Sequence, residues 1–528
     1  MKLLNIFLVL LGLMAFAACS EDFLDAEPIT QVTDVNFYKT PADAYAGMVG
    51  CYDGMQRASG GIGGLSYQTA TEVMSDNCFG GVGNADGFGF QAVDEFDVNR
   101  SPGDQNLLEN LWTAYYAGIY RCNVFLGKVD QIDWNGQEDL RDTYESEVRV
   151  IRAHLCFNMV RMWGNIPLLT EPSTENLPQA NPDEVYAVIA QDLIFAAEHM
   201  KQEPYTSVES GRITAWAAKS LLARVYLYYT GYYGKSDLVG MLTGAQALQH
   251  LEDVIANSGH GLVDDFASLW PAASLDNYAG ETNEEIVFSV RFTFTSDYNG
   301  NTDGNHWMVM YGMREFTYYP YATGWGVTVN PALYDTYAAG DTRRDASIIG
   351  VDEEGIPFDK IPNQREYTGY YVKKYTPMST EDGTSVVTPL GGTDFQIGQF
   401  QDFIVMRYAD VLLMAAELGS ANAQDYFDMV RERAYQDNFS PLAVSQQAIM
   451  KERQLEFPFE SLRIWDLLRQ GLSTAGTALA QNTTLLNGGV EVNKVISPSN
   501  VELTQGLQQI PNNQITLSNG VLQQNAGW

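Results

Sequence analysis

Apolar residues recur at intervals of three and four positions along much of this chain, a spacing that predicts amphipathic helices. The clearest example runs from residue 144 to residue 162. Its apolar positions, with arginines between them, are Tyr144, Val148, Ile151, Leu155, Met159 and Met162. The run Gly164-Asn165-Ile166-Pro167 predicts the end of this helix, because glycine and proline stop helices.

Capping residues mark where other helices begin. Thr40 followed by Pro41 predicts one helix start, and Thr214 predicts another helix over 215–233. Asp183 is expected to cap a helix that runs to about Met200. The same periodicity predicts further helices at 245–255, 402–419, 423–435, 445–457 and 460–469.

Two stretches interrupt the helical pattern. Residues 60–95 are rich in glycine, which predicts a surface loop. Residues 284–292 predict a β-strand. Residues 293–400 have no long helical period, and only 330–339 predicts a short helix there. We therefore expect an irregular α+β insertion on a helical scaffold.

Pairs of helices joined by short turns predict a mainly α fold, a tetratricopeptide-like helical-repeat superhelix. Small residues that would fit at helix crossings are present, for example Ala217-Ala218 and Ala415-Ala416. The expected organisation is a scaffold over 41–288 that includes the glycine-rich loop 60–95, the irregular insertion over 289–400, and a C-terminal helical-repeat region over 401–528.

The first residues have the pattern of a bacterial lipoprotein signal. Lys2 precedes an apolar run from Leu3 to Ala18, which is shorter than the roughly 20 residues that span a bilayer. Small residues end the run directly before Cys19. We expect 1–18 to be a signal peptide, Cys19 to carry lipid and 19–40 to be a tether. An ordinary secretory signal with an incidental cysteine is the alternative.

Composition narrows the possible functions. The formal net charge is −35, from 31 Lys+Arg against 66 Asp+Glu. Nucleic acid is not expected as a partner, because phosphate contacts need lysine and arginine. None of the five cysteines forms a C-x-x-C pair, so neither a metal site nor a cofactor is expected. Cys51, Cys122 and Cys156 are expected to be small core residues.

Motifs in order along the chain resemble the RagB/SusD family of bacterial surface lipoproteins. The C-terminal part carries the most specific ones. Proline at 458, and Ser461-Leu462 in place of the usual Gly-His, depart from that pattern, and Pro458 predicts a helix break. The matching segments are 19–25, 71–76, 112–123, 147–169, 217–229, 407–417, 430–434, 452–467, 510–511 and 524–528.

The resemblance implies a binding protein and not an enzyme. Members of that family capture glycan, or in some cases peptide, as a lid over a TonB-dependent outer-membrane transporter. The implied partners are therefore a glycan, a SusC-like TonB-dependent transporter and the outer membrane through the lipid anchor. A peptide is the alternative ligand, and a cationic one would suit the charge of −35. A glycoside hydrolase on an (α/α) barrel is the alternative from another class.

The resemblance also places most ligand contacts in the insertion and in the first long loop. Aromatic rings stack on the apolar faces of sugars, and polar side chains between them bind the hydroxyl groups. The alternative is that these rings form the insertion's own core. The expected ligand-binding residues are Trp307, Tyr311, Arg314, Tyr318, Tyr319, Tyr321 and Trp325 in the insertion, and Asp76, Asn77, Phe79 and Phe88 in the loop.

Other candidate chemistry is weaker. Residues 297–304 alternate oxygen-bearing side chains as a calcium loop does, but Thr302 and Met308 stand where glycine and glutamate belong, so a polar turn is expected. The sequence has no H-E-x-x-H and no G-x-S-x-G motif, and no catalytic residue is expected. The arginines at 407, 431, 433, 453 and 463 are expected to form structural ion pairs with glutamates at helical spacing, namely those at 417, 432, 456 and 460.

The lipid anchor can be tested directly. Cys19→Ser removes the thiol that would carry the lipid, so the protein should move from the membrane fraction to the soluble fraction. Fractionation followed by immunoblotting measures this. A variant that stays in the membrane fraction would contradict the prediction.

Overall fold

The computed structural model describes residues 37–86, 90–100 and 106–528. The expected signal peptide 1–18, Cys19, and all but the last four residues of the tether 19–40 lie outside these ranges. Among the described residues, none of the helices combines the length and the apolar character needed to span a bilayer.

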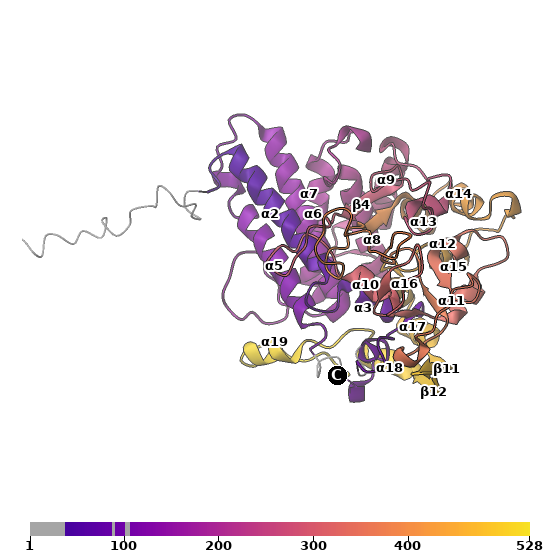
Figure 1. The fold of residues 1–528 in the computed structure, drawn as a ribbon. Helices are drawn as coiled ribbons and strands as arrows, with labels where there is room; N and C mark the ends of the chain where they lie inside the picture. Colours follow the sequence, from indigo (N-terminus) through magenta and orange to yellow (C-terminus); the bar gives the residue numbers. More distant parts are fainter. Residues whose placement is uncertain (1–36, 87–89, 101–105) are drawn as a thin grey trace, which may run out of the picture.

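The first half of the chain forms a stack of long helices. Each helix packs against the next one along the chain, and Figure 1 shows α2, α5, α6 and α7 side by side. This arrangement confirms the mainly α scaffold. The long helices are α2 (Pro41–Gly60), α5 (Glu109–Leu126), α6 (Glu138–Trp163), α7 (Pro182–His199), α8 (Ala215–Tyr233) and α9 (Gly244–Asn257), and the short ribbon β2 (Asp237–Leu238) with β3 (Leu242–Thr243) precedes α9.

Side-chain caps begin several of these helices. The Asp43 N–H donates to the Thr40 hydroxyl at 3.3 Å, and the Thr40 N–H donates to the Asp43 carboxylate at 2.9 Å. This reciprocal capping box fixes the start of α2. Thr214 caps α8 as predicted. The prediction that Asp183 caps α7 is wrong: Asn181 is the cap, and Asp183 lies in the first turn, where the helix dipole favours its charge.

The helix predicted over 144–162 is longer, and it is buried on nearly all sides rather than amphipathic. Arg152 lies inside, with Nε and Nη2 each 2.8 Å from the Asp192 carboxylate of α7. Arg161 lies over the Phe157 ring, 3.9 Å from its centre. His154 is buried in the same helix, and burial lowers its pKa to about 3. The arginines between the apolar positions therefore mark buried ion pairs and ring contacts.

The C-terminal part begins with a strand where a helix was predicted. β10 (Phe403–Arg407) pairs antiparallel with β4 (Ile286–Val290), the strand predicted over 284–292. The helix prediction for 402–419 is wrong over these residues because a short continuous apolar run suits a buried strand as well as a helix. The helices that follow are α13 (Tyr408–Glu417), α14 (Ala423–Tyr435), α15 (Gln446–Glu456), α16 (Arg463–Leu468), α17 (Leu472–Leu479), α18 (Pro498–Thr504) and α19 (Asn512–Leu517).

The polar terminal segment folds back onto the scaffold. β11 (Gln481–Asn487) and β12 (Val490–Ile496) form a hairpin. Its turn, Gly488-Gly489, has φ angles of 60° and 80°, which glycine adopts without steric cost. Asn525 Nδ2 donates to the carbonyl of Trp163, the last residue of α6, at 2.9 Å. The end of the chain is therefore part of the packed structure.

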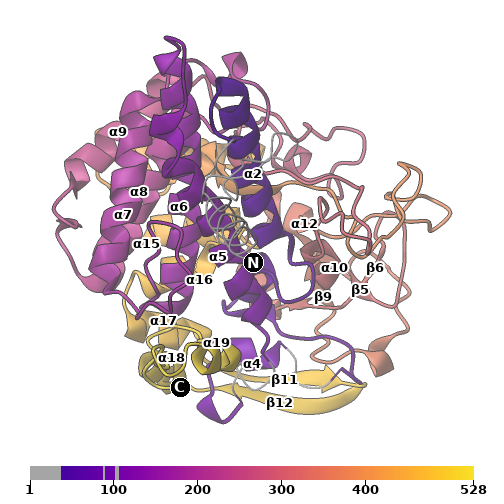
Figure 2. The same ribbon diagram turned by 90° about the vertical axis from the view of Figure 1, so that its left-hand side faces the viewer.

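Irregular α+β structure lies between β4 and β10, where the sequence predicts an insertion. The prediction that only 330–339 is helical there is wrong, because two further short α-helices lie at 307–311 and 343–347. The four-stranded sheet of the insertion has the order β1-β7-β9-β8, and β1 comes from the glycine-rich segment. In Figure 2 the labelled insertion elements β5, β6, β9, α10 and α12 lie on the side of the molecule opposite α7, α8 and α9. The elements are β1 (Cys78–Phe79), α10 (Trp307–Tyr311), β5 (Met313–Arg314), β6 (Thr323–Gly324), β7 (Thr328–Val329), α11 (Pro331–Thr336), α12 (Arg343–Ser347), β8 (Ile348–Gly350) and β9 (Tyr370–Val372).

The glycine-rich segment is largely buried, so the prediction of a surface loop is wrong. It contains α3 (Tyr67–Val73) and α4 (Gln91–Asp94), and every residue of both helices is buried. A Cβ on Gly80 would lie 2.5 Å from the backbone of Phe90, and one on Gly81 would lie 2.5 Å from the Arg365 carbonyl oxygen. These glycines therefore allow close packing of backbone segments, a role that composition does not distinguish from a loop.

Buried charges join the scaffold to the insertion and to the C-terminal helices. Arg407 at the end of β10 lies 2.8 Å from Glu456 of α15 and 2.8 Å from Glu460, and it also pairs with Glu285 just before β4. Arg343 of the insertion reaches the other carboxylate oxygen of Glu456 at 3.0 Å. The prediction that these arginines form structural ion pairs is confirmed, but most of the predicted partners and their helical spacing are wrong. Arg407 and Arg433 bind Glu456 from other elements.

The other three arginines use acids that the sequence did not select: Arg431 binds Glu452, Arg453 binds Asp410 and Asp466, and Arg463 binds Asp76.

Removing one member of this network should destabilise the protein strongly, because the remaining charges stay buried. Arg407→Ala leaves Glu285, Glu456 and Glu460 buried without one shared partner, so the free energy of unfolding should fall by about 3–5 kcal/mol. Urea denaturation followed by circular dichroism measures the change. Arg344→Ala is the matched control, because it removes an exposed pair with Asp345 that contributes about 0.5 kcal/mol or less. Equal losses in both variants would refute the assigned role.

Candidate ligand-binding surface

Burial divides the predicted ligand-binding residues into two groups. Trp307 and Tyr311 of α10 have exposed fractions of 1% and 0%. The Trp307 ring meets Tyr375 and Phe403 edge-on, at centroid distances of 4.8 Å and 5.8 Å. Tyr321 is also buried, and its hydroxyl donates to Glu354 at 2.7 Å. The prediction that these three rings contact ligand is wrong, because other residues of the chain cover them.

The loop residues predicted to bind ligand are also mostly inside. Asn77 and Phe79 are buried. Asp76 is only partly buried, but Arg463 of α16 binds both of its oxygens, each at 2.7 Å. The prediction that Asp76, Asn77 and Phe79 contact ligand is therefore corrected, because these residues connect the glycine-rich segment to the core and to α16. Phe88 lies outside the described residues.

Four predicted residues remain accessible, and they belong to one short unit of the insertion. β5 and β6 pair in parallel, with Arg314 opposite Gly324. Trp325 follows directly after β6, and its backbone N–H donates to the Val309 carbonyl of α10 at 2.7 Å. Tyr318 and Tyr319 lie in the loop between the two strands, with exposed fractions of 40% and 45%. The buried α10 therefore supports the exposed residues.

Glycine makes this unit compact. A Cβ on Gly324 would overlap the Cα of Gly312 and the Val309 carbonyl oxygen. The absence of side chains at 312 and 324 lets the backbone of β6 approach the end of α10 closely. Trp325 and Arg314 are thereby fixed on adjacent positions of one rigid base.

Asp86 brings the glycine-rich segment to the same surface. Its carboxylate lies 3.2 Å from Arg314 Nη2, and Oδ2 accepts the N–H of Gly83 at 3.1 Å. A Cβ on Gly83 would overlap both the guanidinium group and this carboxylate. The sequence prediction placed ligand contacts in this loop and in the insertion, but it did not select Asp86. No motif distinguishes this aspartate from the many other acidic residues.

Glu315 adds a second carboxylate beside the arginine. Its oxygen lies 3.5 Å from Arg314 Nη2. Its φ is +50°, a left-handed conformation that a residue with a side chain adopts only at some energetic cost. Asn363 Nδ2 donates to the other Glu315 oxygen at 2.7 Å, which holds the side chain in place. Arg314 is therefore flanked by two acids from two segments.

We use the name Trp325 surface for the accessible residues of this unit together with the side chains that contact Arg314 and Glu315: Asp86, Arg314, Glu315, Tyr318, Tyr319, Trp325 and Asn363. The guanidinium carbon of Arg314 lies 5.8 Å from the Trp325 ring centre, and His306 meets that ring edge-on at 6.0 Å. Burial lowers the pKa of His306, which favours its neutral form. Partly exposed rings beside fixed polar groups can hold a flat, hydroxyl-rich ligand.

A separate cavity of about 360 Å³ lies in the scaffold. Residues 205–214, which lead into α8, form one wall, and β4 forms another. Tyr205 and His260 stack in its wall at 4.2 Å, and burial lowers the pKa of His260 to about 4. Arg291 also lines it and donates to Ser210 and Thr282 at 2.8 Å. None of the predicted ligand-binding residues lines this cavity.

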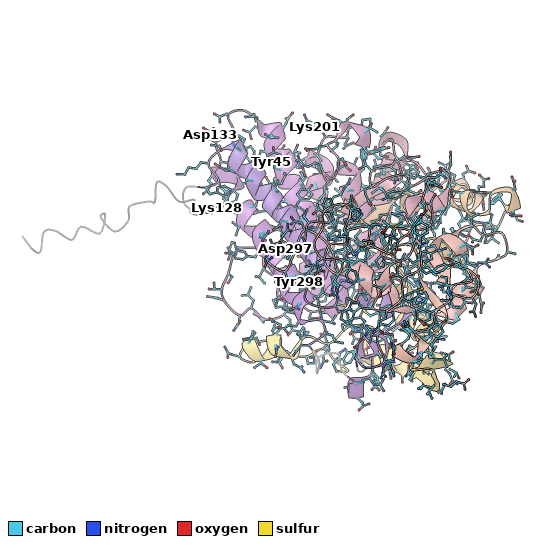
Figure 3. The ribbon with its side chains drawn as sticks, viewed as in Figure 1. Tyr45, Lys128, Asp133, Lys201, Asp297 and Tyr298 are labelled. Carbon is cyan, nitrogen blue, oxygen red and sulfur yellow. The ribbon has the colours of Figure 1, made fainter. Side chains whose placement is uncertain are left out.

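The calcium-like segment forms a polar turn, as expected. Asp297 Oδ1 accepts hydrogen bonds from the backbone N–H groups of Asn299 and Asn301 at 2.8 Å and 3.2 Å, and these bonds stabilise the turn. Figure 3 shows Asp297 and Tyr298 beside each other, and Tyr298 is 69% exposed. Within the described ranges, no cluster of three or more His, Cys, Asp or Glu side chains could hold a metal ion.

Two family models match successive parts of the chain. Residues 22–227 match the family described as starch-binding, associating with the outer membrane, and residues 355–528 match the SusD family. SusD-like protein P25 of Formosa agariphila is 25% identical, over 89% of this chain and 90% of its own length. This chain is a SusD-like family protein.

Solved structures agree with this assignment. The structure of surface glycan-binding protein A from Bacteroides fluxus has a TM-score of 0.77 and 25% identity, covering 93% of this chain and 100% of that one. A laminarin-binding SusD-like protein has a TM-score of 0.71 and 28% identity, with the same coverage. The helical scaffold and insertion of this SusD-like protein are thus shared over nearly the whole chain.

The different burial of the two tryptophans of the insertion predicts losses of stability of different size when each is replaced by alanine. Trp307→Ala should lower the free energy of unfolding by about 3–5 kcal/mol, because it opens a cavity in the core. Trp325→Ala should lower it by about 1 kcal/mol or less, because that ring is only partly buried. Urea denaturation of both variants measures the difference. Equal stability of the two variants would contradict the assignment of Trp307 to the core.

Proposed function

We propose that this SusD-like protein binds glycan on the Trp325 surface and passes it to a SusC-like TonB-dependent transporter, while lipid on Cys19 holds the protein at the outer membrane. The observation that carries the proposal is that the accessible rings of Tyr318, Tyr319 and Trp325 belong to the same short unit as Arg314, the partner of Asp86. Rings of this kind contact the C–H faces of a sugar, and the polar groups bind its hydroxyls.

The relatives support a glycan ligand and an outer-membrane location. Two similar structures carry the names surface glycan-binding protein A and laminarin-binding SusD-like protein. The family model that matches residues 22–227 is described as associating with the outer membrane. The lipoprotein-like pattern that ends at Cys19 supports anchoring by lipid.

An exposed surface suits capture followed by release. Rings that are only partly covered by ligand bury little apolar area, so the dissociation constant should be on the order of micromolar to millimolar. Such binding lets the ligand leave toward a transporter without an input of energy. The protein itself performs no bond cleavage in this proposal.

Affinity electrophoresis of residues 20–528 in gels that contain different polysaccharides tests the proposal. One or more neutral polysaccharides should retard the protein, and no reducing ends should be released. Trp325→Ala should weaken binding by about 2 kcal/mol, or roughly thirtyfold. Tyr45→Ala is the matched control, because Tyr45 is 44% exposed on α2, at the scaffold end of the molecule (Figure 3).

Three results would contradict the proposal. Release of reducing ends would indicate a glycoside hydrolase. Retardation by none of the polysaccharides, together with binding of tryptic peptides, would indicate the peptide-capturing alternative. Equal loss of binding in Trp325→Ala and Tyr45→Ala would show that the Trp325 surface is not the site.

A further inference from the structure

The charges on the Trp325 surface do not balance. Arg314 carries one positive charge, and Asp86 and Glu315 carry two negative charges at 3.2 Å and 3.5 Å from the same nitrogen, Nη2. The three side chains together are therefore one negative charge in excess. The whole chain has a formal charge of −35, so its long-range field has the same sign.

The two carboxylates are fixed rather than incidental. The Gly83 N–H binds Asp86 at 3.1 Å, and Asn363 Nδ2 binds Glu315 at 2.7 Å. The Arg314 side chain is only 17% exposed, whereas the carboxylate side chains are 35% and 50% exposed. A ligand that approaches this surface therefore meets the acids before it meets the guanidinium group.

A neighbouring cationic side chain, Arg365, is held by the backbone of the glycine-rich segment. Arg365 Nη2 donates to the Asn84 carbonyl at 3.3 Å, in the same glycine-rich turn that holds Asp86. His306 meets the Trp325 ring edge-on at 6.0 Å, and burial lowers its pKa and favours its neutral form. An anionic sugar at this surface would therefore meet in Arg314 a guanidinium group already flanked by two acids, and in His306 a ring that favours its neutral form.

We infer that Asp86 and Glu315 are specificity-determining residues that make the Trp325 surface selective for uncharged glycans and exclude polysaccharides that carry carboxylate or sulfate groups. The inference rests on the proposed glycan binding and adds the charge class of the ligand. Like charges placed side by side in a partly desolvated site cost binding free energy, and this cost acts against the wrong ligand only. Neutral sugars keep both carboxylates as hydrogen-bond acceptors.

The double variant Asp86→Asn with Glu315→Gln tests this assignment. Both changes keep the side-chain shape and one acceptor oxygen for Gly83 and Asn363, but they leave Arg314 with an unpaired charge. Binding of polygalacturonate, the anionic probe, should strengthen by about tenfold or more. That gain should shrink as salt is added, because screening weakens it. Binding of neutral laminarin, starch, xylan or xyloglucan should not strengthen, because these ligands carry no charge that the two carboxylates repel.

A matched control separates the site from the net charge. Glu171→Gln with Glu198→Gln removes the same two charges at exposed positions, the second of them on α7, which lies on the side of the molecule opposite β5 and β6 (Figure 2). This control should bind polygalacturonate no better than the unchanged protein. Equal gains in both double variants would show that total charge, and not the Asp86–Arg314–Glu315 group, selects the ligand.

The outcomes distinguish the inference from the proposed function. If the unchanged protein binds a neutral glycan and also binds polygalacturonate equally well, the charge selectivity is refuted and glycan binding stands. The same holds if the Asp86→Asn, Glu315→Gln protein gains no polygalacturonate binding. If neither protein binds any of the polysaccharides, the proposed function falls and the inference falls with it.

Discussion

Glu456 binds arginines from three separate parts of the chain, and the arrangement of the molecule depends on this shared carboxylate. Arg343 comes from the insertion, Arg407 from β10 and Arg433 from α14. Removing these charges from water is costly, so they are tolerated inside only when all of them are paired at once. The insertion, the strand pair β4–β10 and the C-terminal helices therefore have to assemble together.

That shared requirement extends to the Trp325 surface. Lys374, in the insertion after β9, lies 2.7 Å from Glu460, which also binds Arg407. The aromatic core of α10 packs against this same region, through Trp307 on Phe403 of β10. β5 and β6 rest on α10 and carry Arg314 and Trp325. The position of the surface is thus set by buried residues that no ligand touches.

Sequence patterns predicted the parts of this structure in which local signals decide. Thr40 and Thr214 were identified as caps because capping is a local interaction, and α14 over 423–435 matches its apolar period. β10 was missed because a buried apolar run has no period to read. Trp307 and Trp325 have the same residue type and neighbouring composition. Only tertiary packing covers Trp307 and leaves Trp325 accessible. The sequence therefore indicates the segment in which accessible rings lie, but not which rings are accessible.

The loop between β5 and β6 has a consequence for how such a protein can change. Both of its ends are fixed by the Met313–Thr323 and Arg314–Gly324 pairs, while Tyr318 and Tyr319 contribute exposed rings rather than core packing. Replacements of Tyr318 and Tyr319 change the exposed rings without removing core contacts, whereas Tyr321 of the same loop is buried and has to stay. Under the proposed glycan binding, ligand preference and folding are therefore encoded by different residues, and one can diversify through evolution while the other stays constant.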